Sequence, residues 1–114
     1  MDTDVNIKEY LDKDDALKRI GGNEGLYKKL LARFVDGDYL DVLCTALQSG
    51  DTEESARAAH TLKGVSANLS LIKIRDISMD LEQEIKNGAD YAACLDELKQ
   101  AFDVTLEIVA EIMN

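Results

Sequence analysis

The sequence predicts an all-α fold, an antiparallel four-helix bundle with one or two short N-terminal helices. Apolar residues recur every three or four positions along most of the chain, the spacing that places them on one face of a helix. The 114 residues include no proline, which leaves long helices uninterrupted. The joins between the periodic segments are short, and short joins favour antiparallel neighbours. A chain of this length forms one core, so we expect a single domain over residues 1–114.

The first 22 residues predict the short helices. One is expected over residues 5–11, where three apolar side chains cover one end of the core: Val5, Ile7 and Leu11. Asp14 is expected to cap the second, because a carboxylate just before a helix accepts hydrogen bonds from its first amide groups. The pair Gly21–Gly22 ends that helix, since glycine permits the left-handed backbone of a helix end.

Residues 23–49 predict two amphipathic helices. Asn23 is the expected cap of the first, the second begins after Gly37 and Asp38, and Gly50 ends it. The two apolar stripes consist of Leu26, Leu30, Leu31 and Phe34 and of Leu40, Leu43 and Leu47.

The next helix carries the only histidine of the chain, His60, and has a well-marked start. Asp51 and Glu54, three residues apart, resemble a capping box. Near residues 68–71 the apolar pattern changes phase, and a new face follows as far as Asn87–Gly88. That face consists of Leu71, Ile74, Ser78, Leu81 and Ile85.

The last helix is expected after Asp90 as its cap and runs for about six turns. Its apolar positions are Leu95, Leu98, Phe102, Val109 and Ile112.

Composition excludes several classes of function. The formal net charge of −10 argues against a nucleic-acid-binding protein, because phosphate backbones are held by clustered lysine and arginine. No apolar run approaches the roughly 20 residues of a transmembrane helix, and the N-terminus lacks the pattern of a signal peptide. We therefore expect a cytoplasmic protein that does not bind membranes and is a monomer.

Other catalytic or metal chemistry finds little support. Cys44 and Cys94 lie beside apolar positions and are expected to be buried or half-buried thiols, since a single histidine is available for a metal site. The neighbouring carboxylates at Glu82 and Glu84 are expected on a solvated helix face, as are Asp14 and Asp15. The sole histidine has no evident acidic partner in its own motif, so no serine triad is expected. The glycine-rich residues 21–25 lack the Lys-Ser/Thr of a phosphate-binding loop and are expected to form a turn.

His60 is expected to face solvent. On a helical wheel the apolar Ala58, Leu62, Val65 and Leu69 fall about 140–200° away from it. An exposed histidine is usually an ordinary surface residue. Here, however, the positions within about 60° of it carry mostly small side chains and two cations. These positions are Glu53, Ala56, Arg57, Lys63, Gly64 and Ala67.

The residues around His60 carry a family resemblance. The run Ala59-His60-Thr61-Leu62-Lys63-Gly64, followed by Ser66, Ala67 and Asn68, resembles the signature of histidine-containing phosphotransfer (HPt) domains. The stretch from Gly22 to Phe34 is similar to the helix that commonly precedes this signature, so the resemblance covers residues 21–110 or so. Ala67 and Ser70 stand where relatives often have glycine, which implies slightly less clearance for a docking partner.

The resemblance implies a phosphorelay function and no ATP site of the chain's own. His60 would accept a phosphoryl group from the aspartate of a response-regulator receiver domain and pass it to a second receiver, within a pathway fed by a sensor or hybrid histidine kinase. No cofactor is expected on this chain, and Mg²⁺ is expected on the receiver. Lys63 would offset phosphoryl charge, although it is also an ordinary exposed lysine. A partner is expected to dock over Ala56, Arg57, Gly64, Ala67 and Asn68.

Two other classes of function remain as alternatives. A non-catalytic adaptor bundle would tolerate replacement of His60. An acyl-carrier-like protein would need a modified serine at a helix start, and Ser78-Met79 fits that pattern poorly because Ile77 precedes it and the expected position is mid-helix.

Overall fold

The computed structural model describes residues 6–114, which form seven α-helices and no strand, so the all-α prediction is confirmed. Val5, expected in the first helix, lies outside the described residues. The helices are α1 (Ile7–Tyr10), α2 (Lys13–Arg19), α3 (Glu24–Asp36), α4 (Tyr39–Ser49), α5 (Thr52–Asn68), α6 (Ile72–Lys86) and α7 (Ala92–Met113).

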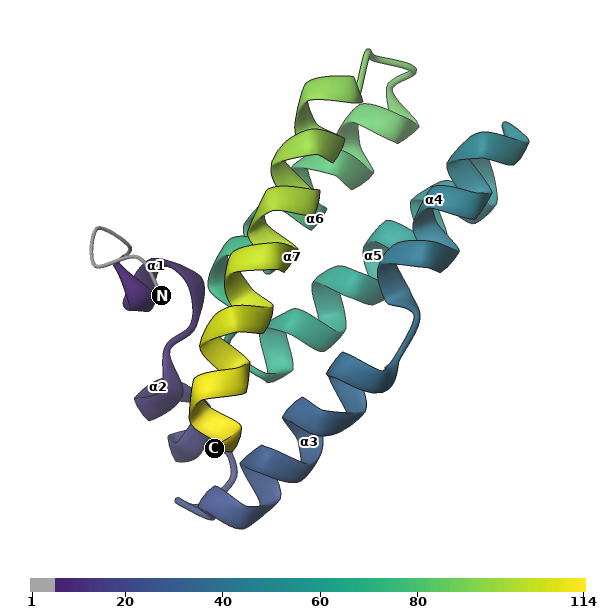
Figure 1. Ribbon diagram of the computed structural model, residues 1–114. Helices are drawn as coiled ribbons and strands as arrows, with labels where there is room; N and C mark the ends of the chain where they lie inside the picture. Colours follow the sequence, from purple (N-terminus) through teal and green to yellow (C-terminus); the bar gives the residue numbers. More distant parts are fainter. Residues whose placement is uncertain (1–5) are drawn as a thin grey trace.

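Five of these helices fill the four positions of the bundle. The helices α3 and α4 follow one another along the same side, and α5, α6 and α7 run alongside them (Figure 1). The closest neighbour of α5 is α6, with α4 next, while α7 packs on α6 and α3. The break between α3 and α4 lies where the sequence predicts it, because Gly37 ends α3 and Asp38 precedes α4.

The apolar stripes predicted from the sequence form most of the core. The expected stripe of α6 is buried in full, and Leu31, Phe34, Leu43, Leu98 and Val109 join it from other helices. The prediction of Leu26 as a core residue of α3 was wrong: Leu26 is 40% exposed, whereas Tyr27 is 1% exposed. The inward face of α3 includes Tyr27 in place of Leu26, and the buried phenolic OH of Tyr27 has an acceptor. It donates a hydrogen bond of 2.9 Å to the carbonyl oxygen of Leu69.

The second short N-terminal helix begins earlier than expected, and the first contributes less to the core than expected. Asp12, not Asp14, caps α2, since its Oδ1 accepts a hydrogen bond of 3.1 Å from the amide of Asp15. Asp14 lies within the first turn because the helix starts at Lys13. Leu11 is buried, but Ile7 is 42% exposed and is not part of the buried core.

Caps mark the other helix starts. Asn23 Oδ1 accepts from the amide of Leu26 at 2.9 Å, as predicted. Asp51 Oδ1 accepts from the amide of Glu54 at 3.0 Å, so the predicted start of α5 is confirmed. At α7 the N-cap position is Tyr91 rather than Asp90, whose carboxylate accepts from the second residue that follows it.

Both cysteines lie where the sequence predicts. Cys44 is half-buried and Cys94 is buried, and burial raises the pKa of the Cys94 thiol to about 11. None of the helices formed by residues 6–114 is long and apolar enough to cross a membrane.

The turn between α5 and α6 is built on Ser70, which has a left-handed backbone with φ of 55°. Glycine adopts this conformation without the cost that a Cβ imposes, so a glycine at this position would be unstrained. Ser70 is buried, and its Oγ donates a hydrogen bond of 2.7 Å to Asp15 Oδ2 on α2. The expectation that Ser70 narrows a docking surface was therefore wrong, because the side chain points inward at the end of α5.

Replacement of Ser70 by alanine should lower the free energy of unfolding by about 1–2 kcal/mol, because the strained backbone stays while the bond to Asp15 is lost. Ser70→Gly should cost less, since glycine removes the strain. Urea unfolding measures both, with Ser49→Ala as a control at an exposed hydroxyl that bonds only within its own helix. Equal losses for the alanine and glycine variants would contradict the strain argument.

Candidate functional site

His60 lies on α5 with its side chain 64% exposed, as the sequence predicts. The buried face of α5 differs from the predicted stripe, because Ala58 and Val65 are half-buried while Ala59 and Ser66 are fully buried. This face is rotated toward α6, the helix against which α5 packs most closely. His60 therefore stands at the edge of the α5–α6 contact instead of on the far side of the helix.

Glu82 on α6 is the partner of His60 across this edge. Its carboxylate oxygens lie 3.3 and 3.2 Å from Nδ1 of His60, and the residue is 4% exposed. The prediction that Glu82 lies on a solvated helix face was wrong. The signal was present in the sequence, since Glu82 stands four residues after Ser78 and three before Ile85, on the buried face of α6.

Two lysines complete the surroundings of the Glu82 carboxylate. Lys63 Nζ lies 3.3 Å from Oε1 and Lys86 Nζ lies 2.9 Å from Oε2. Lys63 comes from α5, one turn after His60, and Lys86 from α6, one turn after Glu82. A buried carboxylate is costly unless it is paired, and here three nitrogen groups surround it.

These contacts determine the charge of Glu82. Burial alone would raise its pKa, but hydrogen bonds from Lys86, His60 and Lys63 together outweigh burial and hold the pKa of Glu82 below its ordinary value. The group is therefore ionised at neutral pH. An ionised carboxylate can only accept hydrogen bonds, so the network assigns the proton of the neutral imidazole to Nδ1. The remaining nitrogen, Nε2, then carries a lone pair, which gives the exposed ring a nucleophilic atom.

The expected cation Arg57 is engaged elsewhere. Its guanidinium forms ion pairs with Glu54 and, at 3.4 Å, with Glu53, both on its own helix. Arg57 still lines the shallow hollow in front of His60, together with Ala56 and Lys86. Lys63 and Lys86 are thus the cations connected to His60, through their shared partner Glu82.

The residues expected to form a docking surface differ in their exposure to solvent. Gly64 is exposed, and a Cβ built on it meets nothing within 4 Å. Asn68 is also exposed and Ala67 is half-buried, but Ala56 is buried and offers a partner little surface. Within residues 6–114, no three histidine, cysteine or acidic side chains come together in a way that would hold a metal ion.

Comparison with known proteins gives one match. A family model described as the Hpt domain matches residues 30–107 of the 114-residue chain, a span that includes both His60 and Glu82. Searches of curated proteins and of solved structures found no match.

The lowered pKa of Glu82 predicts a pH-dependent contribution to stability. A carboxylate whose pKa falls on folding stabilises the fold above its ordinary pKa, and that stabilisation is lost as the pH falls through the lowered value. Glu82→Gln should therefore lower the free energy of unfolding by about 1–3 kcal/mol at pH 7, and the difference from the wild type should shrink in acid.

Urea unfolding of both proteins between pH 7 and pH 3 tests this prediction. Glu107→Gln is the control, because it removes the same charge at an exposed position of α7. A difference between Glu82→Gln and wild type that stays constant over this pH range would show that the carboxylate is not held in its ionised form.

Proposed function

The chain belongs to the Hpt domain family, and on that premise we propose that it carries a phosphoryl group on His60 between receiver domains of a two-component phosphorelay. Histidine phosphotransfer in two-component systems is the function of this family. The observation that carries the assignment to His60 is its geometry: an exposed imidazole whose Nδ1 is held by an ionised, buried carboxylate.

The chemistry of the transfer fits this geometry. The Nε2 lone pair attacks the phosphorus of an aspartyl phosphate, an N–P bond forms, and the bond from phosphorus to the aspartate oxygen breaks. The aspartate leaves as a carboxylate, and no proton has to move. The product is a phosphorylated ring that keeps its Nδ1 proton and bears a positive charge, which the Glu82 carboxylate stabilises through the same hydrogen bond. The reverse transfer to a second receiver breaks the N–P bond.

The remaining groups at the site would neutralise phosphoryl charge and let the partner protein approach. Lys63 and Lys86 keep positive charge beside the ring, where it offsets the charge of the phosphoryl oxygens. The Mg²⁺ that such a transfer uses is proposed to sit on the receiver, because positioning and charge neutralisation can be shared between the partners. Gly64, Ala67 and Asn68 are proposed to receive the docked partner. The acidic partners of Arg57 make it a weaker candidate for that surface than the sequence suggests.

The acyl-carrier alternative loses its support in the structure. Ser78 is fully buried in the middle of α6, where no prosthetic group can reach its hydroxyl. The adaptor alternative makes a different prediction for His60, which the following experiment separates from phosphotransfer.

A His60→Gln variant should stay folded, since the side chain is mostly exposed and a glutamine amide can still donate to Glu82, and should accept no acid-labile phosphate from a phosphorylated receiver domain. Thermal melting and transfer of labelled phosphate measure the two properties. The wild-type chain incubated with Mg²⁺-ATP alone should stay unlabelled. Undiminished labelling of the variant would move the phosphorylation site elsewhere, and labelling by ATP alone would refute the role of a carrier that depends on a donor.

Gly64→Gln should keep or raise the melting temperature and slow transfer from a receiver. The substitution removes a helix-weakening glycine, worth up to about 1 kcal/mol, and its Cβ enters open space. The longer side chain would stand one turn from His60 and keep the reacting atoms from closing.

Gly25→Gln is the matched control, because Gly25 lies in α3 with only an ordinary contact to its Cβ position and should leave transfer unchanged. Transfer by Gly64→Gln at the wild-type rate would exclude a docking role for Gly64.

A further inference from the structure

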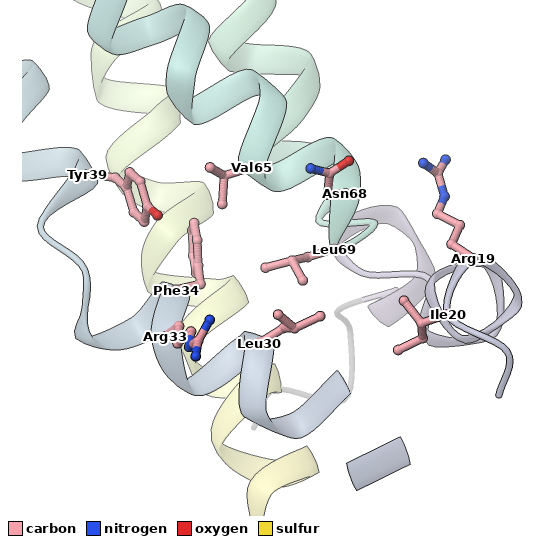
Figure 2. A pocket seen from close by; sticks show the side chains of 9 residues that line it. All are labelled: Arg19, Ile20, Leu30, Arg33, Phe34, Tyr39, Val65, Asn68 and Leu69. Carbon is pink, nitrogen blue, oxygen red and sulfur yellow. The ribbon is translucent and has the colours of Figure 1, made fainter. Parts of the chain in front are cut away.

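A second site lies on the other side of α5 from Glu82. Between α2, α3, α5 and the first residue of α4 the chain forms a pocket of about 490 Å³, a size typical of small-molecule sites. Figure 2 shows Phe34 and Leu30 of α3 facing Val65 and Leu69 across it. These four apolar side chains line most of the interior.

The interior is held in place by the core. Phe34 and Leu69 are both buried, and the ring of Phe34 stacks on Tyr39 with centroids 5.5 Å apart. Leu69 is fixed further by the hydrogen bond that its carbonyl accepts from Tyr27. A ligand would thus meet walls that are already ordered, which lowers the entropic cost of binding.

The charges at the rim have one sign. Arg33 and Arg19 are the charged residues that line the pocket, and they stand at opposite ends of it (Figure 2). Arg19 pairs with Asp15 at 3.3 Å, whereas Arg33 makes no ion pair within residues 6–114. The hollows at His60, beside α1 and between α3 and α7 each include at least one carboxylate. Because Arg19 is paired, the unpaired Arg33 is the group at this rim that would attract an anion, in a chain whose net charge of −10 otherwise disfavours anions.

We propose that this pocket binds a small organic anion with a flat apolar body. The body would cover Leu30, Phe34, Val65 and Leu69, and a sulfonate, carboxylate or phosphate would meet the unpaired guanidinium of Arg33. Asn68, also on the rim, offers an amide for a further hydrogen bond. This inference goes beyond phosphotransfer and does not rest on it, since neither His60 nor the groups that hold it line the pocket, and Asn68 is the one residue shared with the proposed docking surface.

Two fluorescent probes with the same apolar body test the proposal. One is 8-anilino-1-naphthalenesulfonate, and the other is N-phenyl-1-naphthylamine, which lacks the sulfonate. The native protein should bind the sulfonate saturably at one site, and at least about tenfold more tightly than the neutral probe, because a hydrogen bond to a charged group contributes this much. Amide NMR shifts should locate the bound probe at residues of α3 and α5 around the pocket.

Two arginine variants separate the pocket from general attraction to positive charge. Arg33→Gln should weaken binding of the sulfonate about tenfold or more and leave the neutral probe unaffected. Arg75→Gln, which removes an arginine on α6 that pairs with Asp76, should change neither affinity. Val65→Phe, which fills the pocket, should weaken both probes.

Cooperative melting of every variant establishes that the probes meet a folded protein. The proposal is overturned by equal affinities of native protein for the two probes, by an unchanged affinity of Arg33→Gln for the sulfonate, or by binding to unfolded protein alone.

Discussion

The carboxylate of Glu82, enclosed between α5 and α6, is the interaction on which the site depends. Burying an unpaired charge would cost several kcal/mol, so the fold keeps this group only because Lys63, Lys86 and His60 surround it. The contacts of His60 and Lys63 with Glu82 join α5 and α6, the two most closely packed helices of the bundle. The arrangement that stabilises the carboxylate therefore also sets the position of the histidine at the surface.

This arrangement suits a carrier better than an enzyme that acts alone. A carrier must accept a group and give it up again, so its nucleophile has to be oriented without being committed to one direction of reaction. A hydrogen bond from Nδ1 to Glu82 would orient the ring and leave the lone pair on Nε2 for the proposed partner. Because the side chain stands 64% exposed, the rest of the machinery can arrive with that partner.

Features that depend on neighbouring residues of one helix were easier to predict from the sequence than contacts between helices. Caps such as Asn23 and Asp51 depend on neighbours three residues away, and the exposure of His60 follows from the period of its own helix. The link from His60 to Glu82 depends on how far α5 is rotated against α6, which helical periodicity alone leaves open by a residue or so. The same uncertainty placed Leu26 in the core in place of Tyr27. The inward position of Ser70 has a different origin, because it follows from the left-handed turn after α5 and not from the rotation of a helix.

Glu82 is expected to fix the proton of the neutral His60 ring on Nδ1. Nitrogen-15 NMR of the imidazole, recorded on unphosphorylated protein at a pH where the ring is neutral, tests it directly. We expect the tautomer with hydrogen on Nδ1 and a bare Nε2, with this preference weakened in Glu82→Gln, whose amide can accept or donate. A ring that carries its hydrogen on Nε2 in the wild-type protein would contradict this assignment, because the nitrogen that faces the partner would then have no lone pair for attack on phosphorus.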